Sequence, residues 1–394
     1  MDLKKFVFYS TLVSIFTEAM RYHIGFDMKF FYLIILFNTV ALLAFNNFVY
    51  NRGLLIFHSI IFITGTISCL IGYNHVGSFL SQFIFLLLIP TYYFSFYTYF
   101  QNRLEDIVKF YCRACLCLAV IGFLKLPLDL SEGESLHSIM LEPAHYCTIV
   151  LPAFFITLKD KSFPRYYFII ISISIILSGS SLGFIGLGLS MILFAKRISI
   201  VKTALTSVIV VGLGLGLYVV FPPFKLRFDD TINSAISSDL SKANLSTYAF
   251  LSNFYVSSQS FLSNPVMGNG IGSHVESRNL YLQDITGIEV FEKAEMDQLN
   301  AKDAASLFSR LMSEMGLIGI VGVFYFIIRF YVPNKDDESL SQKVIISRAI
   351  LLYFFAKLFR EGHYFSPEMY FFVFLYVFNK YDDMGRIKPD FANE

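Results

Sequence analysis

Ionisable residues at the ends of long apolar runs are the part of this sequence that could do chemistry. They are Glu142, His145, Arg310, Glu314, Lys357, Arg360, Glu361 and His363, and a long polar segment adds Arg227 and Arg278. A charged side chain at membrane depth is costly, so it is usually paired, faces a wet cavity or serves a function. Arginine offers phosphate a bidentate fork, and a carboxylate or histidine accepts a proton from a hydroxyl group. The chain also has 45 Phe and 24 Tyr, which suit contacts with lipid tails and sugar rings. Together with the ionisable residues, they suit a lipid diphosphate that carries a glycan.

Each of these residues also has a purely structural interpretation. Glu142 precedes a proline, and a negative charge there favours a helix N-terminus. His145 would then be an ordinary interfacial histidine. Arg310 and Glu314 are four residues apart, which allows an ion pair on one helix face. The stretch 360–363 ends an apolar run, where cations suit the helix dipole and long side chains reach the headgroups.

Composition places these residues in a membrane protein. Of 394 residues, 55% are hydrophobic and only 15% are charged, whereas soluble domains have roughly 25% charged residues. We therefore predict an all-α polytopic membrane protein. The net charge of +1 gives no field that would attract nucleic acid, so no nucleic-acid partner is expected.

The apolar runs predict about twelve transmembrane helices, most of them near the ~20 residues that cross the hydrocarbon. The predicted spans are Phe6–Met20, Phe30–Phe45, Leu54–Tyr73, Phe79–Phe100, Ile107–Leu126, Pro143–Leu158, Tyr166–Leu177, Leu182–Ala195, Ile198–Phe221, Leu307–Tyr331, Val344–Phe359 and Met369–Phe378. The one long polar segment, 222–306, must lie in water on one side. The chain thus divides into residues 1–221 with about nine spans, the loop 222–306, and residues 307–394 with about three spans and a tail.

Lys and Arg near helix ends are retained on the cytoplasmic side, and this rule orients the chain. If successive spans cross the membrane in alternating directions from a cytoplasmic N-terminus, the basic short loops lie inside, from Lys4 and Lys5 to Lys380 and Arg386. Both termini are then cytoplasmic, and segment 222–306 lies outside. The ionisable residues at the ends of the apolar runs would surround one outward-facing cavity.

The cysteines and glycines are interpreted as packing residues. The five cysteines lie within or beside apolar runs, and the C-x-x-C of CRACLC has no second pair or histidine beside it. We expect neither a metal nor a cofactor. The glycines of SLGFIGLGLS and VGLGLGL let neighbouring helices approach closely in lipid.

Several stretches, taken in order, resemble the bacterial O-antigen and capsule polymerase family, within a wider polymerase and ligase superfamily. The resemblance covers roughly Glu142–Phe378. It is carried by LEPAHYCTIVLPAFF, ILSGSSLGFIGLGLSMILF, NPVMGNGIGSH, SLFSRLMSEMGLIGIVGVFYFI and KLFREGHYFSPEMYFF. Its strongest element is P-x-x-G-x-G in the long loop, followed by E-x-G-x-x-G from Glu314.

The resemblance implies a glycosyltransferase of the bacterial inner membrane, with a helical bundle like that of the GT-C class and an active site on the periplasmic face. In that family, a growing glycan on undecaprenyl diphosphate moves onto the terminal sugar of a new lipid-linked repeat, without a metal. The resemblance assigns Arg310 and Arg360 to the diphosphate, with Arg278 and Arg227 as helpers from the loop. His363 or Glu142 would be the base, supported by Glu314, His145 and Lys357. A chain-length regulator and a flippase are the partners that such an enzyme would have, besides its lipid-linked substrates and the bilayer.

Two departures from the superfamily pattern bear on the choice of function. Ser180 and Ser181 stand where many members have Ser-Arg. Ala305 stands where ligases place a histidine, which favours a polymerase over an O-antigen ligase that joins glycan to lipid A-core. His274 is too far from that position to replace it. A third hypothesis is a transporter or flippase of lipid-linked sugar, but no duplicated half is visible in the sequence.

Overall fold

The computed structural model describes residues 2–23, 27–131, 134–193, 212, 218–219, 222–237, 239–241, 243–285, 287–335 and 340–386. Its elements are α1 (Leu3–Ser14), β1 (Arg21–His23), β2 (Asp27–Lys29), α2 (Phe30–Ala44), α3 (Arg52–Ile71), α4 (Val76–Tyr99), η1 (Gln101–Arg103), α5 (Leu104–Ser131), α6 (Pro143–Lys159), α7 (Arg165–Leu177), α8 (Ser181–Leu193), α10 (Pro222–Ser237), α11 (Leu245–Ser263), α12 (His274–Tyr281), η2 (Leu282–Asp284), α13 (Ile288–Lys293), α14 (Leu307–Phe330), α15 (Gln342–Arg360) and α16 (Met369–Asp383). The protein is mostly helical, as the composition predicts.

Four helices in the described residues are long and apolar enough to cross a membrane: α3, α4, α5 together with η1, and α14. Helices α2, α7 and α8 are apolar but shorter. Helix α1 ends at Ser14, earlier than predicted, because the chain turns there toward a short hairpin. Most of the predicted span 198–221 lies outside the described residues.

The all-α prediction holds for the described residues apart from one short hairpin. β1 and β2 pair antiparallel, with Arg21 opposite Lys29. The hairpin brings Lys29 to within 3.6 Å of the buried Glu18 carboxylate, so it places a cation beside a buried acid.

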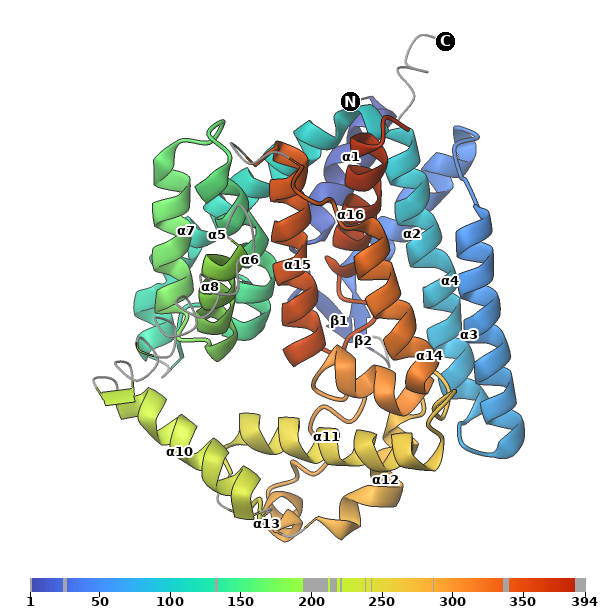
Figure 1. Cartoon of the computed structure of the whole chain (residues 1–394), viewed down its shortest axis with the longest axis vertical. Helices are drawn as coiled ribbons and strands as arrows, with labels where there is room; N and C mark the ends of the chain where they lie inside the picture. The colour runs from blue at the N-terminus through green and yellow to red at the C-terminus, as the bar shows by residue number, and fades with distance from the viewer. Residues whose placement is uncertain are drawn as a thin grey trace.

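Two layers build the molecule. Most helices stand side by side, and α10, α11, α12 and α13 lie across one end of them (Figure 1). The transverse layer has its own small core, in which the Tyr248 and Phe291 rings stack with centroids 3.7 Å apart. Helix α1 begins and α16 ends at the opposite end of the bundle (Figure 1). The described residues of the polar segment 222–306 therefore form a folded, largely helical layer.

Helix α6 is central to the upright helices, and every residue from His145 to Thr157 is buried. Small residues on α8 allow this packing. A Cβ at Gly183 would lie 2.7 Å from the Cys147 sulfur, and one at Gly186 would overlap the Leu151 side chain. The prediction that these glycines permit close helix packing is confirmed for both positions.

Candidate active site

The glycine-rich loop after α11 packs directly against a break in α14. The Gly270 amide donates to the Glu314 carbonyl oxygen at 2.8 Å, and Gly316 leaves the helical conformation with φ of 56°. A Cβ at Gly268 would lie 2.5 Å from the Glu314 carbonyl carbon, and one at Gly316 would lie 2.6 Å from the Pro265 oxygen. The motifs P-x-x-G-x-G and E-x-G-x-x-G therefore meet in space, and glycine is required because backbone lies against backbone.

Arg310 is buried beneath this contact and holds three segments together. Its Nε donates to Glu314 at 3.2 Å, its Nη1 to the Gly362 carbonyl oxygen at 3.0 Å, and its Nη2 to Gln82 at 2.6 Å. The guanidinium also lies 3.9 Å from the centroid of the Tyr364 ring. The ion pair with Glu314 confirms the spacing argument. A diphosphate would reach Arg310 only by displacing some of these partners.

Lys357 lies in the last turn of α15 and is surrounded by acids. Its ammonium is 2.8 Å from Glu361 and 3.4 Å from Glu368, and it donates to the Ser366 hydroxyl at 2.8 Å. The side chain is buried. A buried charge is tolerated when it is paired and hydrogen-bonded, so Lys357 fixes the chain between α15 and α16.

His145 joins the same acidic group from the side of α6. Its Nε2 lies 3.3 Å from Glu142 and 3.6 Å from Glu361, and its Nδ1 lies 3.5 Å from Glu18. Glu142 is the N-cap residue of α6 and is followed by proline, but its side chain makes no capping hydrogen bond. At 52% exposure, the Glu142 carboxylate is the accessible edge of this otherwise buried group.

His363 pairs with Asp303, a residue that the sequence analysis does not single out. The His363 Nε2 is 2.8 Å from Asp303 Oδ2, with 37% of the histidine side chain and 9% of the aspartate side chain exposed. Asp303 also accepts from the Ala305 amide at 3.1 Å and from the Asn300 amide group at 3.0 Å. Burial alone would raise the pKa of Asp303, but His363 and these donors lower it well below its usual value. Asp303 is thus an anion at neutral pH that orients a partly exposed imidazole.

The segment 361–363 connects these groups. Its first residue bonds to Lys357, its second accepts a hydrogen bond from Arg310, and its third pairs with Asp303. The order Glu-Gly-His after α15 therefore aligns three interactions on consecutive residues. Most of the predicted site residues belong to this one constellation.

Arg360 ends α15 beside the transverse layer. Its Nη2 donates to the Ser246 hydroxyl at 2.7 Å and its Nη1 to the Ser246 carbonyl oxygen at 3.3 Å. Unlike Arg310, this arginine is not buried. Among the predicted phosphate ligands whose side chains the structure describes, it is the one that an incoming anion reaches most directly.

The two arginines of segment 222–306 have other positions. Arg278 is completely buried, and all five of its N–H donors have acceptors. The acceptors are the carbonyl oxygen of Asp297 and the side-chain oxygens of Tyr248, Ser252 and Asn253. Arg278 therefore holds the transverse layer together, and a phosphate would reach it only by displacing some of these acceptors. Arg227 lies in α10, and its side chain is outside the described part of the chain.

His274 connects this layer to α14. Its Nδ1 is 2.9 Å from the Ser313 hydroxyl, and its Nε2 is 3.0 Å from the Asn253 side-chain oxygen. Burial lowers the pKa of His274 to about 3, and the charges of Arg310 and Arg278 contribute. The imidazole is therefore neutral in the folded protein.

The His274 pKa predicts how stability depends on pH. The folded pKa is below the ordinary value of 6.5, so the contribution is complete above pH 6.5 and is lost as pH falls toward 3. At pH 5 the wild-type protein should lose about 2 kcal/mol through this group, relative to pH 7. Unfolding of detergent-solubilised wild type and His274→Gln, followed at both pH values, isolates the effect because all other titrating groups are shared. Equal pH dependence in the two proteins would contradict this assignment.

Sequence reasoning missed several residues of the site. Asp303, Glu18, Gln82 and Glu368 come from four different parts of the chain. Glu18 had a signal, since a carboxylate that ends an apolar run is costly without a partner. Asp303 lies in a polar stretch, where the sequence does not distinguish it from the other acids.

No protein-family model matches this sequence, and no curated protein matches it at a significant level.

Proposed function

We propose that this chain is a glycosyltransferase that polymerises glycan repeats carried on undecaprenyl diphosphate, for O-antigen or capsular polysaccharide. The observation that carries the proposal is the partly exposed His363, held by the buried Asp303 carboxylate at 2.8 Å, three residues after the accessible Arg360. A base and a phosphate-binding cation then stand at one end of the helix bundle. The motif order in the sequence supports the same reaction.

His363 and Arg360 account for the fate of the proton and of the leaving group. Because Nε2 faces Asp303, the His363 Nδ1 is left to accept the proton of the attacking sugar hydroxyl. The hydroxyl oxygen forms a bond to the anomeric carbon, and the bond from that carbon to the diphosphate oxygen breaks. The electron pair leaves with the lipid diphosphate, whose growing charge Arg360 stabilises. Arg310 acts as a positioning residue, since it holds the Gly362 carbonyl oxygen beneath the pair.

The proposal includes a topology. About twelve spans in a GT-C-like bundle would place both termini in the cytoplasm and the α10–α13 layer in the periplasm of a bacterial inner membrane. The start of α1 and the end of α16 lie at one end of the bundle and the layer lies at the other, which supports this orientation (Figure 1). A chain-length regulator and a flippase remain the proposed protein partners.

Substitution of Arg360 tests the phosphate-binding role. We expect Arg360→Ala to reduce glycan transfer by about 10²-fold or more, because a charge-assisted contact to the leaving group is lost. Arg360→Lys should restore part of the activity, since the charge remains without the bidentate fork. Arg329→Ala is the matched control: this exposed arginine lies in the last turn of α14, far along that helix from the candidate site. Normal transfer by Arg360→Ala protein present at wild-type levels in the membrane would refute the role.

A gel of surface polysaccharide from a deletion strain separates the functions. Loss of the gene should leave lipid A-core bearing a single repeat, and wild type should restore the ladder where Arg360→Ala does not. Core without any repeat would contradict a polymerase and point to a ligase or a flippase. Transfer of glycan to lipid A-core by purified protein would then identify the ligase, and movement of labelled lipid-linked sugar into proteoliposomes without bond formation would identify the transporter.

A further inference from the structure

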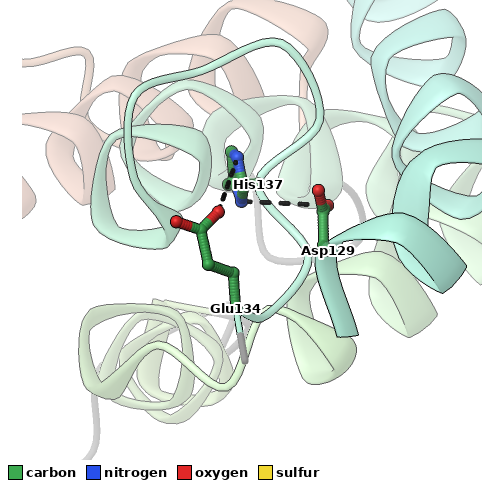
Figure 2. A group of neighbouring side chains, drawn as sticks. All are labelled: Asp129, Glu134 and His137. Atoms are coloured by element: carbon green, nitrogen blue, oxygen red, sulfur yellow. Dashed lines mark ion pairs between the residues drawn. The ribbon is translucent and has the colours of Figure 1, made fainter. Parts of the chain in front are cut away.

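A second group of chemically competent side chains lies where α5 passes into the segment before α6. Among the described residues, Asp129, Glu134 and His137 each present one ligand atom, and these atoms lie within 4.8 Å of one another. Figure 2 shows the three side chains pointing toward one another. None of them belongs to the candidate active site.

The tautomer of His137 suits metal binding. Its Nδ1 lies 2.8 Å from the Ser135 carbonyl oxygen, which can only accept, so Nδ1 carries the proton and Nε2 carries the lone pair. Metal-binding histidines are commonly oriented by such a hydrogen bond from the other nitrogen. The Nε2 lies 3.5 Å from Glu134 Oε2, and the ring is largely buried.

Asp129 provides an independent observation. Its side chain is 1% exposed, and its Oδ2 has no hydrogen-bond partner, although it lies 3.8 Å from the His137 Nδ1. Burying a carboxylate oxygen without a partner is costly. Because Lys125 already pairs with Oδ1 at 3.1 Å, only a cation bound by both carboxylate oxygens would remove that cost.

A cation already contacts two of these three side chains. The Lys125 ammonium is 2.9 Å from the His137 Nε2 and 3.1 Å from Asp129 Oδ1. The Lys125 side chain is 40% exposed, so it has room to leave toward solvent. The His137 Nε2 and Asp129 Oδ1 atoms would close by roughly 1 Å around a smaller ion, to reach the ~2.0–2.2 Å of zinc bonds to nitrogen and oxygen.

We propose that Asp129, Glu134 and His137 form a binding site for a divalent transition metal, best matched by Zn²⁺, in which Lys125 competes with the metal. One imidazole and two carboxylates suit Zn²⁺, which leaves a fourth position for water, whereas Mg²⁺ prefers oxygen ligands alone. The bound ion would tie the end of α5 to the segment that leads into Glu142 and α6. The expectation of no metal came from the cysteines, which lie elsewhere.

The test is Zn²⁺ binding by the full-length protein, purified in detergent and stripped with a chelator. Competition with a chromophoric chelator should show one saturable site in wild type and no comparable site for Mg²⁺. Glu134→Gln should weaken binding by about tenfold or more. This residue is 57% exposed, so its substitution leaves the fold intact.

Lys125→Met gives the distinguishing result, because removal of the competing ammonium should raise Zn²⁺ affinity by about tenfold. Surface histidines and thiols would not respond in this way. His75→Gln is the matched control, since His75 is exposed and pairs with Glu276 on another part of the molecule. Unchanged affinity in both Glu134→Gln and Lys125→Met, or no saturable binding by wild type, would overturn the proposal and leave a group of ion pairs.

Discussion

We expect His363→Gln to lower the rate of glycan transfer by about 10²–10⁴-fold, the usual contribution of a general base. Glutamine keeps a polar side chain near Asp303 but cannot take the proton of the acceptor hydroxyl. The rate is best measured with purified protein in proteoliposomes and a lipid-linked repeat as substrate. At saturating substrate, the loss should appear in kcat.

Asp303→Asn should produce a similar loss by a different route. The pKa of Asp303 lies well below its usual value, so at neutral pH it accepts a hydrogen bond from His363 as an anion. This contribution to stability is complete above the ordinary aspartate pKa and is lost as pH falls through the lower folded value, so it does not vary near neutrality. An asparagine can offer its amide instead and allow the ring to adopt the wrong tautomer.

His75→Gln is the control for both variants, because it breaks an exposed histidine–carboxylate contact outside the site. It should leave the transfer rate unchanged. Wild-type kcat in both His363→Gln and Asp303→Asn would exclude the pair from the reaction. A loss confined to His363→Gln would make Asp303 a purely structural partner.

Gly362→Ala is expected to have the second large effect. A Cβ at this position would overlap the Asp303 carbonyl oxygen and lie 3.1 Å from the Ser306 oxygen. Both obstacles are backbone atoms, so a side-chain rotation cannot relieve them. Overpacking of this kind costs about 3 kcal/mol or more, and here it pushes the His363 segment away from Asp303. We expect a lower unfolding temperature in detergent and loss of transfer activity.

The matched control is Gly77→Ala in the first turn of α4. A Cβ there meets nothing within 4 Å, so alanine should be neutral or slightly stabilising in the helix. A Gly362→Ala protein with the unfolding temperature and activity of wild type would contradict the close packing of segment 361–363.

The sequence by itself determined the class of the protein, the positions of the long helices and several local contacts. Apolar runs such as Leu54–Tyr73 and Leu307–Tyr331 coincide closely with α3 and α14, because hydrophobic length is a property of neighbouring residues. The Arg310–Glu314 pair followed from helical spacing alone.

Only the tertiary structure decided which distant groups meet. Asp303 beside His363, Gln82 beside Arg310 and Glu18 beside His145 join segments far apart in the chain, and no local pattern encodes such contacts. The sequence did not predict burial either, because Arg278 and Arg360 are both arginines that it places in the outer region. Folding surrounds Arg278 with acceptors and leaves Arg360 accessible. The packing of helices such as α11 and α12, rather than composition, determines which side chains water can reach.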